Sequence, residues 1–120
     1  MPNPLYDALF APLSLRTSPL LILADGAQIT GAQFHTTIAR AANALRAAGV
    51  QAGDRVAVQI AKSPEALALY AASVSIGAVF LPLNPAYTPP EVGYFLNDAT
   101  PRLFICDPAK ADALGAVARQ

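Results

Sequence analysis

Among the side-chain types that can act in catalysis, histidine and cysteine each occur once in this sequence. His35 could serve as a general base and Cys106 as a thiol nucleophile, but each needs a suitably spaced partner. No serine, cysteine or carboxylate constellation is spaced to supply one. The setting of His35 beside an apolar helical stripe favours a solvated or edge position, and the apolar run around Cys106 favours a small buried side chain. We therefore assign no catalytic residue, and a lone cysteine supplies no metal site.

The charged candidates stand next to turns and helix starts. Lys62 and Glu65 flank a predicted helix start, and Asp54 with Arg55 forms a predicted turn, so all four are expected in solvent. The sequence contains no G-x-G-x-x-G loop, no Walker A loop and no G-x-S-x-G elbow. The local motifs therefore do not indicate a particular reaction.

One loop occupies a position where ligands bind in related architectures. The segment Pro82-Leu83-Asn84-Pro85-Ala86-Tyr87 leaves the carboxyl end of a predicted parallel strand and leads into a helix start. Ligands of open α/β sheets bind outside the carboxyl ends of the strands. Pro82, Pro85 and Pro89 restrict φ and stiffen the loop. It could form one wall of a ligand crevice, or it could be a rigid connection only.

The elements that must hold this loop alternate between strand and helix. A hairpin is expected first, with extended pieces at Leu20–Ala24 and Gln28–Thr30 around the turn Asp25-Gly26. Short apolar runs then predict buried strands at Val56–Ile60, Ala78–Leu81 and Leu103–Cys106.

Helices are expected after the hairpin and after each strand. Their starts carry capping patterns, namely Thr30 with Gln33, Ser63-Pro64, Thr88 with Glu91, and Asp107-Pro108. Glycines at positions 49 and 77 are suited to end the first two helices. The helix from Pro64 to Ile76 is apolar almost all round, so we expect it to be sandwiched between other elements.

These elements together predict an α/β fold. An N-terminal β-hairpin is followed by alternating β/α units that form a mostly parallel sheet with helices on both faces. Continuous apolar strands are typical of such a doubly covered sheet.

Composition limits the class of partner. Eight basic and eight acidic residues cancel, which gives no electrostatic footprint for nucleic acid or for an anionic membrane. Only 13% of the residues are charged, where about 25% is usual. In so short a chain this deficit predicts that other protein covers part of the surface.

The uncharged stretch from Ala66 to Pro90 is long enough to span a membrane. Ser73, Gly77 and Pro82 interrupt it, which favours a helix, a break and a strand instead. Met1 to Leu15 lacks the positive charge of a secretory signal. A single cysteine also fits a reducing compartment, so we expect a cytoplasmic protein.

Four blocks of the sequence resemble, in order and spacing, the N-terminal region of adenylate-forming acyl-CoA synthetases. They are G-V-x-x-G-D-R-V-A-V (Gly49 to Val58), K-S-P-E-A (Lys62 to Ala66), G-A-V-F-L-P-L-N-P (Gly77 to Pro85) and E-V-G-Y-F-L-N-D (Glu91 to Asp98). The stretch from Tyr87 to Lys110 is most similar to malonyl-CoA synthetases. The resemblance implies that residues 1–120 form an incomplete N-terminal subdomain of such an enzyme.

The resemblance also implies a two-step reaction with ATP, Mg²⁺ and coenzyme A (CoA) as cofactors. A small carboxylic acid, malonate or methylmalonate, attacks the α-phosphate of ATP to give an acyl-adenylate and pyrophosphate. The CoA thiol then displaces AMP. In the family a phosphate loop and a lysine on a C-terminal domain carry this chemistry. Neither occurs between Met1 and Gln120, so no family catalytic residue transfers and this segment alone is expected to be inactive.

The resemblance implies a binding role for one site in this sequence, the loop that follows Leu81. In related synthetases the residues corresponding to Asn84, Pro85 and Ala86 lie near the CoA channel. With Tyr87 they are predicted to form a CoA-side wall. Some relatives have glycines here and this sequence has none, which restricts close approach of the backbone to the cofactor.

Two other functions stay open. The complete set of helix caps would also suit a self-contained, non-catalytic α/β binding module. An adenylation domain that loads a carrier protein instead of CoA would share the first half-reaction.

Overall fold

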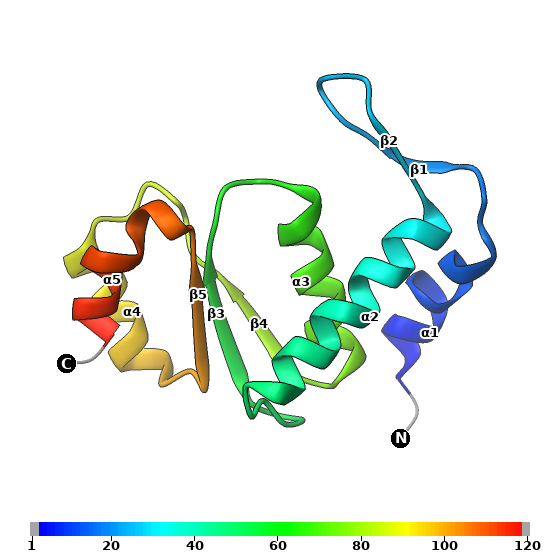
Figure 1. The fold of residues 1–120 in the computed structure, drawn as a ribbon. Helices are drawn as coiled ribbons and strands as arrows, with labels where there is room; N and C mark the ends of the chain where they lie inside the picture. Colours follow the sequence, from blue (N-terminus) through cyan, green and yellow to red (C-terminus); the bar gives the residue numbers. More distant parts are fainter. Residues whose placement is uncertain (1–2, 119–120) are drawn as a thin grey trace.

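The computed structural model describes residues 3–118, and Figure 1 shows how its elements are arranged. The helices are α1 (Pro4–Leu9), α2 (Gly31–Ala47), α3 (Pro64–Ser75), α4 (Pro89–Ala99) and α5 (Ala111–Ala118). The strands are β1 (Pro19–Ile22), β2 (Gln28–Thr30), β3 (Arg55–Gln59), β4 (Val79–Pro82) and β5 (Leu103–Cys106). Short 3-10 helices cover Ala11–Leu15 and Pro108–Lys110.

Strand β3 is the centre of a parallel three-stranded sheet with the order β4-β3-β5. Val56 pairs with Phe80 on one side and with Leu103 on the other. Helices α2 and α3 cover one face of the sheet, and α4 and α5 cover the other (Figure 1). The predicted α/β fold, with a parallel sheet and helices on both faces, is confirmed.

The predicted hairpin is also confirmed, as a separate antiparallel pair of β1 and β2. Its first strand runs from Pro19 to Ile22, slightly earlier than expected. The turn begins sooner because the Leu23 N–H donates to the Ala27 carbonyl (2.8 Å) and closes it. The Asp25 carboxylate accepts from the Ala27 N–H (2.9 Å), and Gly26 adopts a φ of 88°, which favours glycine.

The N-terminal segment holds helical structure that the sequence analysis does not predict. Asn3 caps α1 by accepting a hydrogen bond from the Tyr6 N–H (3.2 Å), while its amide donates to the Val74 carbonyl of α3 (2.6 Å). Phe10 follows and is buried, with its ring 6.2 Å from that of Tyr70. These contacts with α3 hold the segment in place.

Helix α3 has most of its apolar surface covered by other elements. Its small residues Ala68, Ala71, Ala72 and Ser73 are buried, because small side chains allow close packing against the neighbouring helix and sheet. Leu67 on the other side is 41% exposed. Among the described residues the helix packs between α2 and the sheet, as expected, and only part of its apolar surface, at Leu67, is left uncovered.

Three of the four predicted helix caps are confirmed. The side chains of Thr30, Ser63 and Thr88 each accept a backbone N–H of the first turn. Asp107 differs, because its side chain makes no capping bond. Its carboxylate instead accepts from the Ala61 N–H (3.1 Å) and so ties the end of β5 to the segment after β3.

The cap of α4 contains a titratable group. Glu91 Oε1 accepts from the N–H of Thr88 (3.0 Å) and from its hydroxyl (2.9 Å). Both hydrogen bonds lower the pKa of Glu91 below its ordinary value of 4.5. The bond from the Thr88 backbone has the larger effect and the bond from the Thr88 hydroxyl the smaller one. A carboxylate with a lowered folded-state pKa stabilises the fold above its unfolded pKa, and that contribution is lost as the pH falls through the folded pKa.

We therefore expect Glu91→Gln, which keeps the acceptor oxygen but cannot titrate, to flatten the dependence of stability on pH below 4.5. The capping box of α2 offers a matched control, because there Gln33 occupies the equivalent position. Gln33→Glu should add a pH dependence of the same sign. Urea unfolding of the chain from neutral pH down to about 3 measures both effects. Parallel stability curves for the wild type and Glu91→Gln would contradict this account.

Candidate functional site

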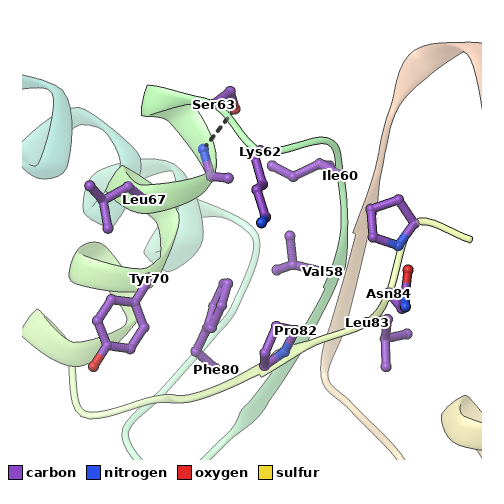
Figure 2. Close-up of a pocket in the computed structure, with 12 residues that line it drawn as sticks. Val58, Ile60, Lys62, Ser63, Leu67, Tyr70, Phe80, Pro82, Leu83 and Asn84 are labelled. Carbon is purple, nitrogen blue, oxygen red and sulfur yellow. Dashed lines mark hydrogen bonds between the residues drawn. The ribbon is translucent and has the colours of Figure 1, made fainter. Parts of the chain in front are cut away.

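A cleft of about 690 Å³ opens at the carboxyl ends of β3 and β4, beside α3 (Figure 2). Its walls are mostly apolar. Strand β3 contributes Val58, helix α3 contributes Leu67 and Tyr70, and β4 contributes Phe80 and Pro82. Such a cleft, with a few polar groups at its edge, is the usual form of a small-molecule site.

Lys62 is the cation of this cleft. Figure 2 shows its side chain extending from the turn before α3 toward the space between that helix and β3. The residue is exposed, as the sequence predicts, but its place on the cleft was not foreseen. Ser63 beside it is already engaged, because its Oγ accepts from the Ala66 N–H (3.1 Å). An exposed ammonium group of this kind can pair with a carboxylate or a phosphate.

The predicted loop leaves β4 at the edge of this cleft, as the sequence analysis expects. Residues of this loop lie on two different hollows of the surface. Asn84 and Pro85 line the cleft. Tyr87 instead borders a second hollow of about 270 Å³ on the α4 side, where its ring stacks on Phe95 at 5.0 Å. Ala86 lies between them and lines neither hollow.

Hydrogen bonds within the loop make it a compact turn. Asn84 Oδ1 accepts from the Ala86 N–H (2.9 Å), and the Asn84 carbonyl accepts from the Tyr87 N–H (3.0 Å). The Leu83 N–H donates to the Val58 carbonyl (2.8 Å) and continues the pairing of the sheet into the loop. These hydrogen bonds therefore stiffen the loop in addition to its prolines.

Two side chains from other elements fix the same loop. Gln59, the last residue of β3, donates from Nε2 to the carbonyls of Asn84 (2.9 Å) and Tyr87 (3.2 Å). Lys110 donates from Nζ to the Pro85 carbonyl (2.7 Å). Neither residue was singled out from the sequence. A glutamine inside the apolar run of β3 was a usable signal for the first, whereas nothing local marks Lys110.

The remaining sequence candidates lie elsewhere. His35 is half-buried on α2 and lies 3.2 Å from the Tyr6 hydroxyl of α1, so it is an edge residue with a structural partner. Cys106 is half-buried in β5. Arg55 donates to the Ala99 carbonyl (2.8 Å), and Asp54 accepts from the Gln51 N–H (2.8 Å). None of these residues lines the cleft.

Residues 3–118 hold no group of three or more histidine, cysteine, aspartate and glutamate side chains that could bind a metal ion. Over the same range, no helix has both the length and the apolar character required to cross a bilayer.

Comparison with known proteins decides the family. Residues 15–120 match the family described as AMP-binding enzyme. The chain belongs to the AMP-binding enzyme family. The resemblance carried by the four sequence blocks is thereby confirmed.

Solved structures within this family superpose on nearly the whole chain. MatB from Rhodopseudomonas palustris, in its apo form, is 44% identical and covers 99% of this chain with a TM-score of 0.92. The ATP-bound form of MatB gives the same values. The chain corresponds to 24% of each MatB chain.

Two curated relatives show how wide the family is. A feruloyl-CoA synthase from an Amycolatopsis species is 40% identical over 93 residues, which is 78% of this chain and 19% of the relative. A protein described as a probable non-canonical nonribosomal peptide synthetase, CymA from Salinispora arenicola, is 34% identical over 109 residues. That match covers 90% of this chain but 1% of CymA.

Proposed function

We propose that this chain is the N-terminal part of an ATP-dependent acyl-CoA synthetase whose acid is malonate or methylmalonate. The observation that carries the proposal is the superposition on MatB over 99% of the chain, together with the similarity of Tyr87 to Lys110 to malonyl-CoA synthetases. In this proposal residues 1–120 are an incomplete N-terminal subdomain, and the remainder of the synthetase is its covalent partner. A reducing cytoplasm is the proposed location.

The proposed reaction balances in two steps. A carboxylate oxygen of the acid attacks the α-phosphorus of ATP, and the bond to pyrophosphate breaks to give an acyl-adenylate. The sulfur of CoA then attacks the acyl carbon, the thiol proton is lost, and AMP leaves. Catalysis of this kind depends on holding the reactants in line and on stabilising the charge that develops on the phosphate.

The residues described here do not fit an ATP–Mg²⁺ site. The sequence lacks a glycine-rich phosphate loop, and residues 3–118 lack a cluster of metal-ligating side chains. In this proposal the segment carries no step of the adenylation. The groups that bind ATP and Mg²⁺ are expected in the remainder of the enzyme.

The loop and cleft do fit one wall of a CoA site. The carbonyls of Asn84, Pro85 and Tyr87 already accept hydrogen bonds from Gln59 and Lys110. The loop can therefore present a rigid surface to a ligand without leaving these backbone acceptors unpaired. The pantetheine arm of CoA is slender and partly apolar, which suits the apolar walls of the cleft. The ammonium group of Lys62 is suited to pair with the phosphates of CoA.

An adenylation domain that acylates a carrier protein is the second candidate. The match to CymA over 90% of the chain supports it. The first half-reaction is the same in both cases, so the acceptor distinguishes them. MatB is 44% identical over nearly the whole chain and CymA 34% identical, which favours CoA as the acceptor.

The acid and the acceptor can be tested with the complete synthetase. We expect ATP–pyrophosphate exchange to be faster with malonate or methylmalonate than with acetate or longer acids. We also expect a thioester to form when CoA is added. Exchange followed by acylation of a carrier protein but not of CoA would support the second candidate. Absence of exchange with every acid would contradict both.

The CoA-side wall predicts a selective kinetic effect. Asn84→Phe adds bulk on the cleft wall, and Ala86→Phe adds it at the exposed position just beyond that wall. Both should raise the KM for CoA by about tenfold, because a bulkier side chain narrows the space left for the ligand along the loop. The KM values for ATP and the acid should not change. Ala113→Phe, at an exposed position of α5, is the matched control. An unchanged KM for CoA in both loop variants would rule out the wall.

A further inference from the structure

We propose that Gln59 is the positioning residue of the CoA-side wall. The two hydrogens on its amide nitrogen hold Asn84 and Tyr87, the two ends of the turn within the loop, in one conformation. The link to CoA rests on the function proposed above. The effect on the loop rests on the geometry alone.

The contacts of Gln59 span the whole turn. Its Nε2 lies 2.9 Å from the Asn84 carbonyl oxygen and 3.2 Å from that of Tyr87. A primary amide has two N–H donors, so one side chain can satisfy both carbonyls at once. The side chain is 0% exposed, which removes competition from bulk water for these bonds.

The orientation of the carboxamide follows from its partners. Both loop atoms are carbonyl oxygens, which only accept hydrogen bonds. A flipped amide would place Oε1 against them, so the nitrogen must face the loop. Oε1 points away and is buried without a donor among residues 3–118. An unpaired buried acceptor is unfavourable. The glutamine at this position is therefore explained by its two donors.

Gln59 acts from outside the cleft. Its neighbour Val58 lines the cleft and Gln59 does not, because alternate residues of a strand point to opposite faces. A substitution at position 59 therefore alters the loop without removing a side chain from the cleft wall. Lys110 is a second tether to the same turn, through its bond to the Pro85 carbonyl at the surface.

The test uses the complete synthetase with two substitutions of similar size. Gln59→Glu replaces the donors by acceptors, and Gln59→Met removes both. We expect both variants to raise the KM for CoA, Gln59→Met by roughly tenfold because two hydrogen bonds are lost. Gln59→Glu should raise it further, because carboxylate oxygens repel the two carbonyls. The ATP–pyrophosphate exchange rate and the KM for the acid should stay at wild-type values. Gln28→Glu, at an exposed position of β2, is the control.

Amide hydrogen exchange gives a reading that does not depend on activity. The N–H groups of Ala86 and Tyr87 are bonded within the loop, and they should exchange faster in both Gln59 variants than in Gln28→Glu. If a buried substitution prevents folding, Lys110→Met supplies the test, because its tether lies at the surface. Its expected effects are a smaller rise in the KM for CoA and faster exchange at the same two amides.

The outcomes separate this inference from the proposed function. If Ala86→Phe raises the KM for CoA while folded Gln59 variants change neither that KM nor loop exchange, the inference is wrong and the wall stands. If the Gln59 variants speed loop exchange but neither they nor Ala86→Phe alter the KM for CoA, Gln59 fixes the loop and the CoA assignment is wrong. An equal loss of adenylation and thioester formation would show a general structural role and overturn the inference.

Discussion

Val56, Ala57 and Val58 of β3 are each 3% exposed or less, because the strand lies between two parallel neighbours with helices over both faces. Each valine buried in this way contributes about 1.5–3 kcal/mol. A strand without a solvated face has to be an apolar run, and its neighbours have to be joined by helices that cross over the sheet. The carboxyl ends of the strands therefore meet at one edge, where the cleft and the loop lie.

Gln59 follows this apolar run and is polar. It connects the core of the fold to the proposed site. It is as deeply buried as the valines, yet its carboxamide is directed to the carbonyls of Asn84 and Tyr87. The same element that forms the centre of the core thus also determines the conformation of the loop at its edge. A loop held in this way from the core, and from the surface by Lys110, offers a ligand a preformed surface. Preorganisation of this kind lowers the entropic cost of binding.

Much of this fold could be predicted from the sequence because it depends on local patterns. Capping boxes at Thr30 and Thr88, the Ser63-Pro64 start and the apolar strands are recognisable within a few residues, and the structure confirms them. The position of the loop after β4 also followed from the order of the elements. Membership of the AMP-binding enzyme family followed from the four sequence blocks.

What the sequence did not reveal depends on contacts between distant segments. The N-terminal helix α1 is held by the hydrogen bond from the Asn3 amide to the Val74 carbonyl of α3, which no local sequence pattern predicts. Asp107 looked like a cap, but Ala61 lies within reach of its carboxylate once the strands align. The division of the loop, with Asn84 facing the cleft and Tyr87 stacked on Phe95, required the three-dimensional arrangement of β4 and α4.

The central claim is that the loop of residues 84–87 is held rigid and presents Asn84 and Pro85 as a wall beside CoA. Its most direct test is amide hydrogen exchange of the complete synthetase, loaded with acid and ATP, with and without a CoA analogue that lacks the thiol. We predict that the analogue slows exchange in peptides covering the loop and leaves helix α2 unchanged. Exchange in the loop that does not respond to a saturating concentration of the analogue would contradict the claim.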